Sequence, residues 1–115
     1  SKPEWEARLE QVSQMADAGE WQDAALAMGT LTSDLQSHEH RLSEAAELVR
    51  FVDEEWKALR RRLDSAGVGP GDTGRMAAEK AVSEASSALE RGEIDSCHKA
   101  LGEASEMLES QSRRV

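Results

Sequence analysis

The sequence is poor in the residues that form disulfides and aromatic pockets: its 115 residues include one cysteine, one phenylalanine, three tryptophans and no tyrosine. The single cysteine, Cys97, cannot form an internal disulfide, which favours a reducing compartment such as the cytoplasm. No apolar run is long enough for a signal peptide or a membrane span. With few aromatic residues and no paired carboxylates on a predicted inward face, the chain has little from which to build a catalytic pocket. We therefore expect neither an enzyme nor a cofactor.

Large apolar side chains are also scarce. Leu, Ile, Val and Phe make up only 19 residues, below the level of about 20% that, together with high net charge, is typical of disordered chains. Against this stand 17 alanines, only two prolines and many Glu, Gln, Arg and Leu residues, which favour or tolerate helix. The composition permits an unfolded chain but favours thin, closely spaced helices.

The formal charge of −9 is unevenly distributed along the chain. Residues 1–49 carry ten acids and three bases, residues 50–75 carry five acids and six bases, and residues 76–115 carry eight acids and five bases. Phosphate backbones and anionic lipids repel such an acidic chain, so neither nucleic acid nor a membrane surface is an expected partner. A protein partner with a basic surface or an amphipathic helix fits the charge better.

The strongest pattern is an apolar stripe that alternates spacings of three and four residues without a break. Twelve of its thirteen positions are apolar, and no proline falls within residues 21–65, so the pattern predicts one continuous helix there. The alternative is a break near Thr30–Asp34 or at Ser37–His38, where β-branched and capping residues weaken helix propensity. The stripe comprises Trp21, Ala24, Met28, Leu31, Leu35, His38, Leu42, Ala45, Val49, Val52, Trp56, Leu59 and Leu63.

Three shorter helices are predicted around the long one. Pro3 and a narrow apolar stripe from Trp5 to Ala16 predict a helix over residues 3–18, ended by Gly19. The long helix is expected over residues 20–65 and a loop over 66–73. Apolar spacing then predicts helices over residues 74–91 and 93–114, with a turn at Gly92 between them.

These elements predict a single all-α domain over residues 1–115, an elongated helical bundle built on one long central helix. Leu48, Phe51 and Ala58 widen the stripe in the second half of that helix, as expected where a helix contacts two neighbours. Residues 42–65 should therefore pack with the C-terminal helical hairpin as three helices of spectrin type. The N-terminal antiparallel helix pairs only with residues 21–38, and such a pair buries little apolar surface.

We therefore expect the N-terminal half to be completed by another chain. A second copy would close a four-helix bundle, so a homodimer is the expected assembly and a different protein is the alternative. His38, the one polar position of the stripe, either fixes the register of pairing or lies at a local gap with its ring in solvent. The expected partner-binding residues are Trp5, Trp21, Met28, Leu31, Leu35, His38 and Leu42.

The glycine-rich stretch Gly67–Met76 has the glycine spacing of a phosphate-binding loop. However, Arg75 stands where such a loop has lysine, and Met76 stands where it has a hydroxyl that binds magnesium. A loop between helices, with Asp72 or Thr73 capping the second helix, explains the stretch better. Basic residues near this loop form a candidate anion site, or else a solvated face paired with neighbouring acids. They are Lys57, Arg60, Arg61, Arg62 and Arg75.

The histidines and the cysteine do not predict a metal site. His38 and His40 lie two residues apart and point to nearly opposite sides of a helix, so they cannot share a metal ion. His40 and Glu44 have suitable spacing but supply only two ligands. Cys97 lies on an apolar stripe, where a buried thiol behaves as a small hydrophobe rather than as a nucleophile.

The sequences around the two predicted turns are weakly similar. Gly19-Glu20-Trp21 begins a stretch with Ala27-Met28-Gly29, and Gly92-Glu93-Ile94 begins one with Ala100-Leu101-Gly102 at the same offset. A repeated hairpin is one explanation, and two similar turns that solve the same geometric problem are the other.

Two resemblances accompany these patterns. The tryptophan segment Phe51–Leu59 with the antiparallel pair that follows resembles a spectrin-type repeat over residues 42–114. The hairpin around Gly19–Trp21 is similar to flagellar export chaperones, small helical proteins that hold partner helices until assembly, over about residues 5–65. From the open N-terminal half we expect a noncatalytic helical interaction or scaffold module that binds a partner helix or self-associates. The alternatives are a small assembly or export chaperone that holds a client helix, and anion or nucleic-acid binding through the Arg60–Arg75 rim.

Overall fold

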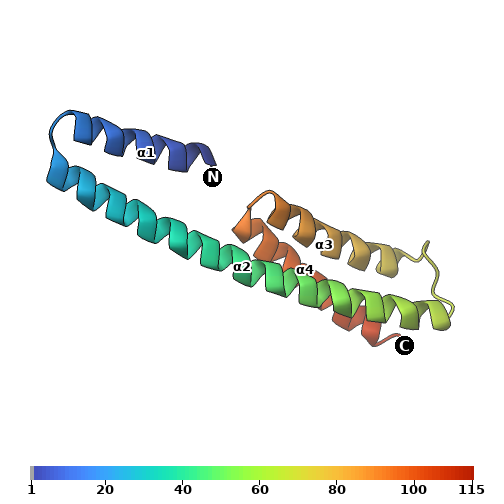
Figure 1. Ribbon diagram of the computed structural model, residues 1–115. Helices are drawn as coiled ribbons and strands as arrows, with labels where there is room; N and C mark the ends of the chain where they lie inside the picture. The colour runs from blue at the N-terminus through green and yellow to red at the C-terminus, as the bar shows by residue number, and fades with distance from the viewer. Residues whose placement is uncertain (1) are drawn as a thin grey trace. The chain divides into compact units, whose positions relative to one another are not determined.

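The computed structural model describes residues 2–115, which form four α-helices and no strand (Figure 1). The helices are α1 (Lys2–Asp17), α2 (Trp21–Ser65), α3 (Thr73–Glu90) and α4 (Ile94–Ser112). The predicted all-α fold is confirmed, and α2 passes through residues 30–38 as helix, without the break that was the alternative. The first three helices end because glycine follows them: Gly19, Gly67 and Gly92 all adopt positive φ, which closes a helix at low steric cost.

The described chain clusters into two compact units, one up to Arg41 and one from Leu42 to Val115. The boundary falls within α2, so each unit contains part of this helix. Burial along α2 changes at this boundary. The stripe residues after Leu42 belong to a continuous buried core, whereas few residues before Leu42 are buried. Each unit is described by itself below.

The first unit is a helical hairpin. The chain reverses at Gly19, whose φ is 79°, and α1 runs back along the first part of α2 (Figure 1). Ala24 and Leu31 are its only buried apolar side chains among the described residues, with exposed fractions of 6% and 1%. A hairpin with so small a core depends on few contacts, because most of the stability of a helix in a protein comes from packing.

The second unit is a three-helix bundle of α3, α4 and the part of α2 that follows Leu42 (Figure 1). Its buried core draws on all three helices and contains six residues of α2, including Trp56, which is 3% exposed. Four of the six buried residues of α3 and two of the buried residues of α4 are alanine, and such small side chains allow helices to approach closely. The core comprises Ala45, Val49, Val52, Trp56, Leu59, Leu63, Ala78, Ala81, Val82, Ala85, Ala88, Cys97, Ala100, Leu101, Ala104 and Leu108.

One expectation about this bundle is wrong in part. Leu48, Phe51 and Ala58 were expected to contact a neighbouring helix; Ala58 lines the groove between α2 and α4, but Leu48 and Phe51 are 46% and 59% exposed. The core forms instead from the stripe positions of α2, such as Val49 and Val52. Because α3 and α4 both pack on that one stripe, Leu48 and Phe51 remain exposed beside it.

Candidate partner-binding surface

Polar and aromatic contacts along the first hairpin fix its antiparallel register. The guanidinium of Arg8 lies 2.9 Å from the Asp34 carboxylate and 5.3 Å from the centroid of the Trp5 ring. The Trp5 ring meets the His38 ring edge to face, with centroids 5.8 Å apart. Residues near the start of α1 therefore lie opposite residues 34–38 of α2, and the Arg8–Asp34 pair marks one edge of the hairpin.

The opposite edge of the hairpin is apolar and exposed. Leu9 and Leu35 each follow a member of the Arg8–Asp34 pair by one residue, which turns them by about 100° around their helices. Since the helices are antiparallel, both turns lead to the same side, away from the ion pair. We define the open edge as this side, which carries Leu9, Ala16, Trp21, Met28 and Leu35; the last three follow each other at seven-residue steps on α2.

The exposure of these side chains is high for apolar groups. Trp21 is 69% exposed, Leu9 47% and Met28 44%, while Ala16 and Leu35 are half-buried. Isolated exposed apolar residues are common on protein surfaces, but several in a row at helical spacing form a continuous stripe. The open edge thus has the pattern of a helix interface without a helix on it.

The other predicted partner-binding residues have different positions. Leu31 is buried between the two helices, and Trp5 and His38 are half-buried in the contact described above. Leu42 is half-buried and belongs to the second unit. Thus the structure places Trp21, Met28 and Leu35 together on the open edge, and it adds Leu9, which the list of expected residues omits although the apolar spacing of the first helix includes it.

Carboxylates flank the open edge. Glu6 lies three residues before Leu9, and Glu39 lies four residues after Leu35, so both project beside the apolar stripe. Glu10 lies on the outer side of the same flank. All three are exposed, and residues 1–41 carry eight acids and three bases. An approaching ligand therefore meets an apolar strip with negative charge on its margins.

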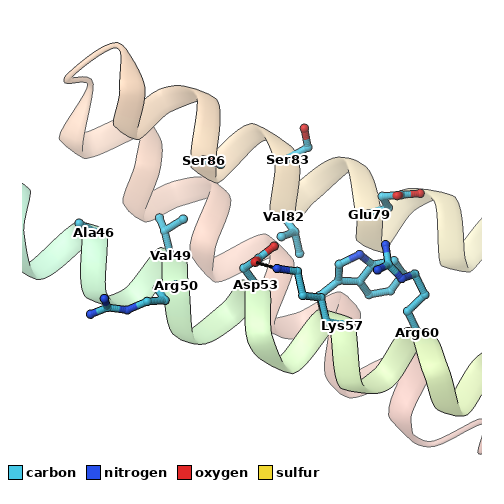
Figure 2. A pocket seen from close by; sticks show the side chains of 11 residues that line it. Ala46, Val49, Arg50, Asp53, Lys57, Arg60, Glu79, Val82, Ser83 and Ser86 are labelled. Atoms are coloured by element: carbon cyan, nitrogen blue, oxygen red, sulfur yellow. Dashed lines mark ion pairs between the residues drawn. The ribbon is translucent and has the colours of Figure 1, made fainter.

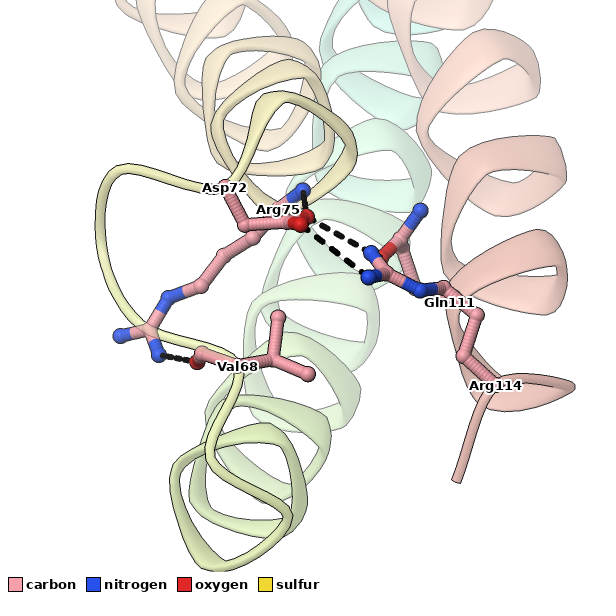
Figure 3. A network of polar contacts seen from close by, with 5 residues as sticks. All are labelled: Val68, Asp72, Arg75, Gln111 and Arg114. Atoms are coloured by element: carbon pink, nitrogen blue, oxygen red, sulfur yellow. Dashed lines mark hydrogen bonds and ion pairs between the residues drawn. The ribbon is translucent and has the colours of Figure 1, made fainter.

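The five basic residues of the predicted anion site do not converge. Arg75 is buried, at 6% exposed, and its guanidinium forms an ion pair with Asp64. The same guanidinium donates a 2.8 Å hydrogen bond to the Val68 carbonyl (Figure 3). Arg62 donates to Ser112 Oγ and to the Val115 carbonyl at 3.4 and 3.3 Å. These two arginines serve the fold, which leaves Lys57, Arg60 and Arg61 for an anion.

The glycine-rich loop is held by a polar network rather than open to a phosphate group. The Asp72 carboxylate caps α3 by accepting from the Arg75 backbone N–H at 3.0 Å, and it accepts two further bonds, at 2.6 and 3.0 Å, from the Arg114 guanidinium (Figure 3). Arg114 also donates to Gln111 Oε1 at 2.7 Å. The bonds from Arg114, followed by that from the Arg75 backbone, lower the pKa of Asp72 from 3.8 to about 2.

Lys57 and Arg60 line a groove of about 480 Å³ between α2 and α3 (Figure 2). Its apolar lining includes Val49, Trp56 and Val82. The α2 wall carries three bases, Arg50, Lys57 and Arg60, and one acid, Asp53, whose carboxylate lies 2.9 Å from the Lys57 ammonium. Glu79 lies on the α3 wall, so the groove carries mixed charge.

Other reactive groups are dispersed. Within residues 2–115 the structure holds no cluster of three or more His, Cys, Asp or Glu side chains that could bind a metal ion. The Cys97 thiol is buried in the second unit, and desolvation raises its pKa. None of the helices in the described part of the chain combines the length and the apolar character that a membrane crossing requires.

Comparisons of the chain with models of protein families, with curated proteins and with solved structures find no match.

Proposed function

We propose that the protein is a noncatalytic helical interaction module whose first hairpin binds another protein along the open edge. The observation that carries this proposal is the row of exposed apolar side chains formed by Leu9, Trp21 and Met28. Full burial of one large apolar side chain is worth about 1.5–3 kcal/mol. A partner that covers this row would therefore gain a substantial part of a specific binding free energy from three residues.

The chemistry of the chain supports binding rather than catalysis. Its one thiol is buried, and burial raises the pKa of that thiol, which disfavours the reactive thiolate. The two arginines nearest the glycine-rich loop are bonded within the fold.

A crosslinking experiment tests the proposal. A photoreactive residue placed at Met28 of the full chain, expressed in its native cells, should yield one or a few discrete crosslinked proteins. The matched control is the same residue at Leu26, which is 72% exposed on the same helix but lies two positions away, about 200° around it. Equal crosslinking at both positions, or none at Met28, would contradict a binding surface on the open edge.

A further inference from the structure

The two helical hairpins of the chain end and restart their helices in the same way. Gly19 and Gly92, 73 positions apart, have φ values of 79° and 72°. In the first turn the Gly19 and Glu20 amides donate to the Ala16 and Met15 carbonyls, at 3.0 and 2.9 Å. In the second turn the amides of the two residues at the same offset donate to Leu89 and Ala88, both at 2.9 Å. The hairpins therefore share one turn geometry, which puts their helices in register.

This shared geometry allows a comparison of the hairpins residue by residue. Leu31 and its counterpart Ala104 are 1% and 0% exposed, so the same position is buried in both hairpins. The open-edge residues Leu9, Ala16, Trp21, Met28 and Leu35 correspond to Val82, Leu89, Ile94, Leu101 and Leu108. Four of these counterparts are no more than 6% exposed, and Leu89 packs against the core.

A helix covers the counterpart edge in the second unit. The grooves on the two sides of α2 are lined by Val82 of α3 and by Leu108 of α4, so the segment of α2 after Leu42 lies over the edge that carries these two residues. We call this segment the cover helix. The edge that a helix covers in the second hairpin is the edge that is exposed in the first.

We infer that the open edge is the docking site of a single amphipathic helix from a partner protein, one with an apolar stripe at alternating spacings of three and four residues and with Lys or Arg on both flanks. The inference rests on the proposed function and specifies its partner. The cover helix provides the template, because its stripe from Ala45 to Leu63 has this spacing and packs on the equivalent edge.

Charge determines the flanks of the partner helix. The cover helix carries Arg50, Lys57 and Arg60 in the groove that also contains Glu79 (Figure 2), the counterpart of Glu6. The open edge has Glu6, Glu10 and Glu39 on its margins and no Lys or Arg at the counterparts of the groove-lining positions. Basic flanks on the ligand would pair with these carboxylates, and they would also accelerate association.

The same charges disfavour a second copy of this chain as the occupant. In a twofold pair, each open edge would face another one, so the margins with Glu6 and Glu39 would meet like charges. Like charges brought together at an interface cost binding free energy. A partner of opposite charge avoids this repulsion.

The test uses the full chain and two synthetic helices of 21 residues with the same leucine stripe, one flanked by lysine and one by glutamate. Calorimetry should give at least about tenfold tighter binding for the lysine peptide. Met28→Asp should weaken its binding by at least about tenfold, since the apolar centre of an interface dominates affinity. Leu26→Asp is the matched control: it adds the same charge away from the open edge and should change the Kd by less than about twofold.

A second variant and a measurement of mass separate the outcomes. Glu6→Lys combined with Glu39→Lys should reduce the preference for the lysine peptide while the helical circular dichroism stays unchanged. Equal affinity for the two peptides would refute the inference that the partner helix is basic. A dimer in sedimentation that Met28→Asp dissociates would refute it too, because a second copy would then occupy the open edge. Both results would still agree with the proposed interaction module. A monomer that binds neither peptide would overturn both.

Discussion

Replacing Leu31 with alanine should detach α1 without unfolding the second unit. Leu31 is 1% exposed and is the one large side chain buried in the first hairpin among the described residues. The substitution removes three carbon groups, and about 0.8 kcal/mol for each gives about 2.4 kcal/mol of lost burial. Cavity formation adds to this, and buried Leu→Ala changes cost about 2–5 kcal/mol in protein cores. Because the open edge lets neighbouring side chains relax, we expect about 2–3 kcal/mol.

That loss is large compared with the stability of a two-helix hairpin, which is marginal in isolation. Hydrogen exchange followed by mass spectrometry should therefore show protection falling in residues 2–41 of Leu31→Ala and persisting in residues 73–112. Leu26→Ala is the control, because it removes the same atoms from a side chain that is 72% exposed and should change stability by less than about 0.5 kcal/mol. A parallel loss of protection in both units would refute the reasoning, since it would mean that they unfold as one cooperative body.

Three further predictions concern the second unit. The lowered pKa of Asp72 contributes stability that is present above its usual pKa of 3.8 and disappears as the pH falls towards 2; acid titration followed by circular dichroism should show a decline over this window that is smaller in Asp72→Asn. In urea unfolding, Gly92→Ala should destabilise the protein by about 1–2 kcal/mol because φ is positive at this residue. Gly102→Ala lies within α4 with open space for a Cβ, so it should stabilise the protein by up to about 1 kcal/mol. Equal effects of the two substitutions would contradict this prediction. The buried Cys97 thiol should react with a disulfide reagent only as fast as the unit opens, so a rate independent of urea would argue against burial.

Helix positions could be predicted from the sequence because they depend on local rules. The predicted ranges 3–18, 20–65, 74–91 and 93–114 differ from the observed helices by at most two residues at each end. Glycine after each of the first three helices and the uninterrupted apolar phase from Trp21 to Leu63 carry this information. The small core of the first hairpin was also predictable, because its stripe is narrow and lacks a second neighbour.

The role of Arg75 could not be predicted in the same way. The sequence groups it with the basic residues near the loop, but its burial depends on how the chain turns between residues 66 and 72. That path brings the Val68 carbonyl and the Asp64 carboxylate to its guanidinium. The Asp72–Arg114 pair likewise joins residues 42 positions apart. Neither contact has a periodic signal, so only the structure separates these arginines from those available to a ligand.

The exposure of Leu48 and Phe51 illustrates the other limit of sequence periodicity. A widened stripe indicates that a helix has more apolar surface, but it does not say whether two neighbours pack on separate faces or share one stripe. Here α3 and α4 share the stripe that contains Val52 and Trp56. In the sequence the relation between the hairpins appears as similar turns followed by Ala27–Gly29 and Ala100–Gly102 at the same offset. It became informative once exposed fractions could be compared at equivalent positions.

The relation between the hairpins also bears on how tightly the open edge can bind. The cover helix is tethered to α3 by the loop after Ser65, and short tethers correspond to effective concentrations of about 1 mM. If its docking contributes about 3 kcal/mol, a modest part of the 5–15 kcal/mol typical of a small domain, it is favoured by a factor of about 150. A free helix that makes equivalent contacts on the open edge would then bind with a Kd of about 10 μM. Such an affinity suits a partner that exchanges, and only further contacts, such as pairs with Glu6 and Glu39, would make the complex long-lived.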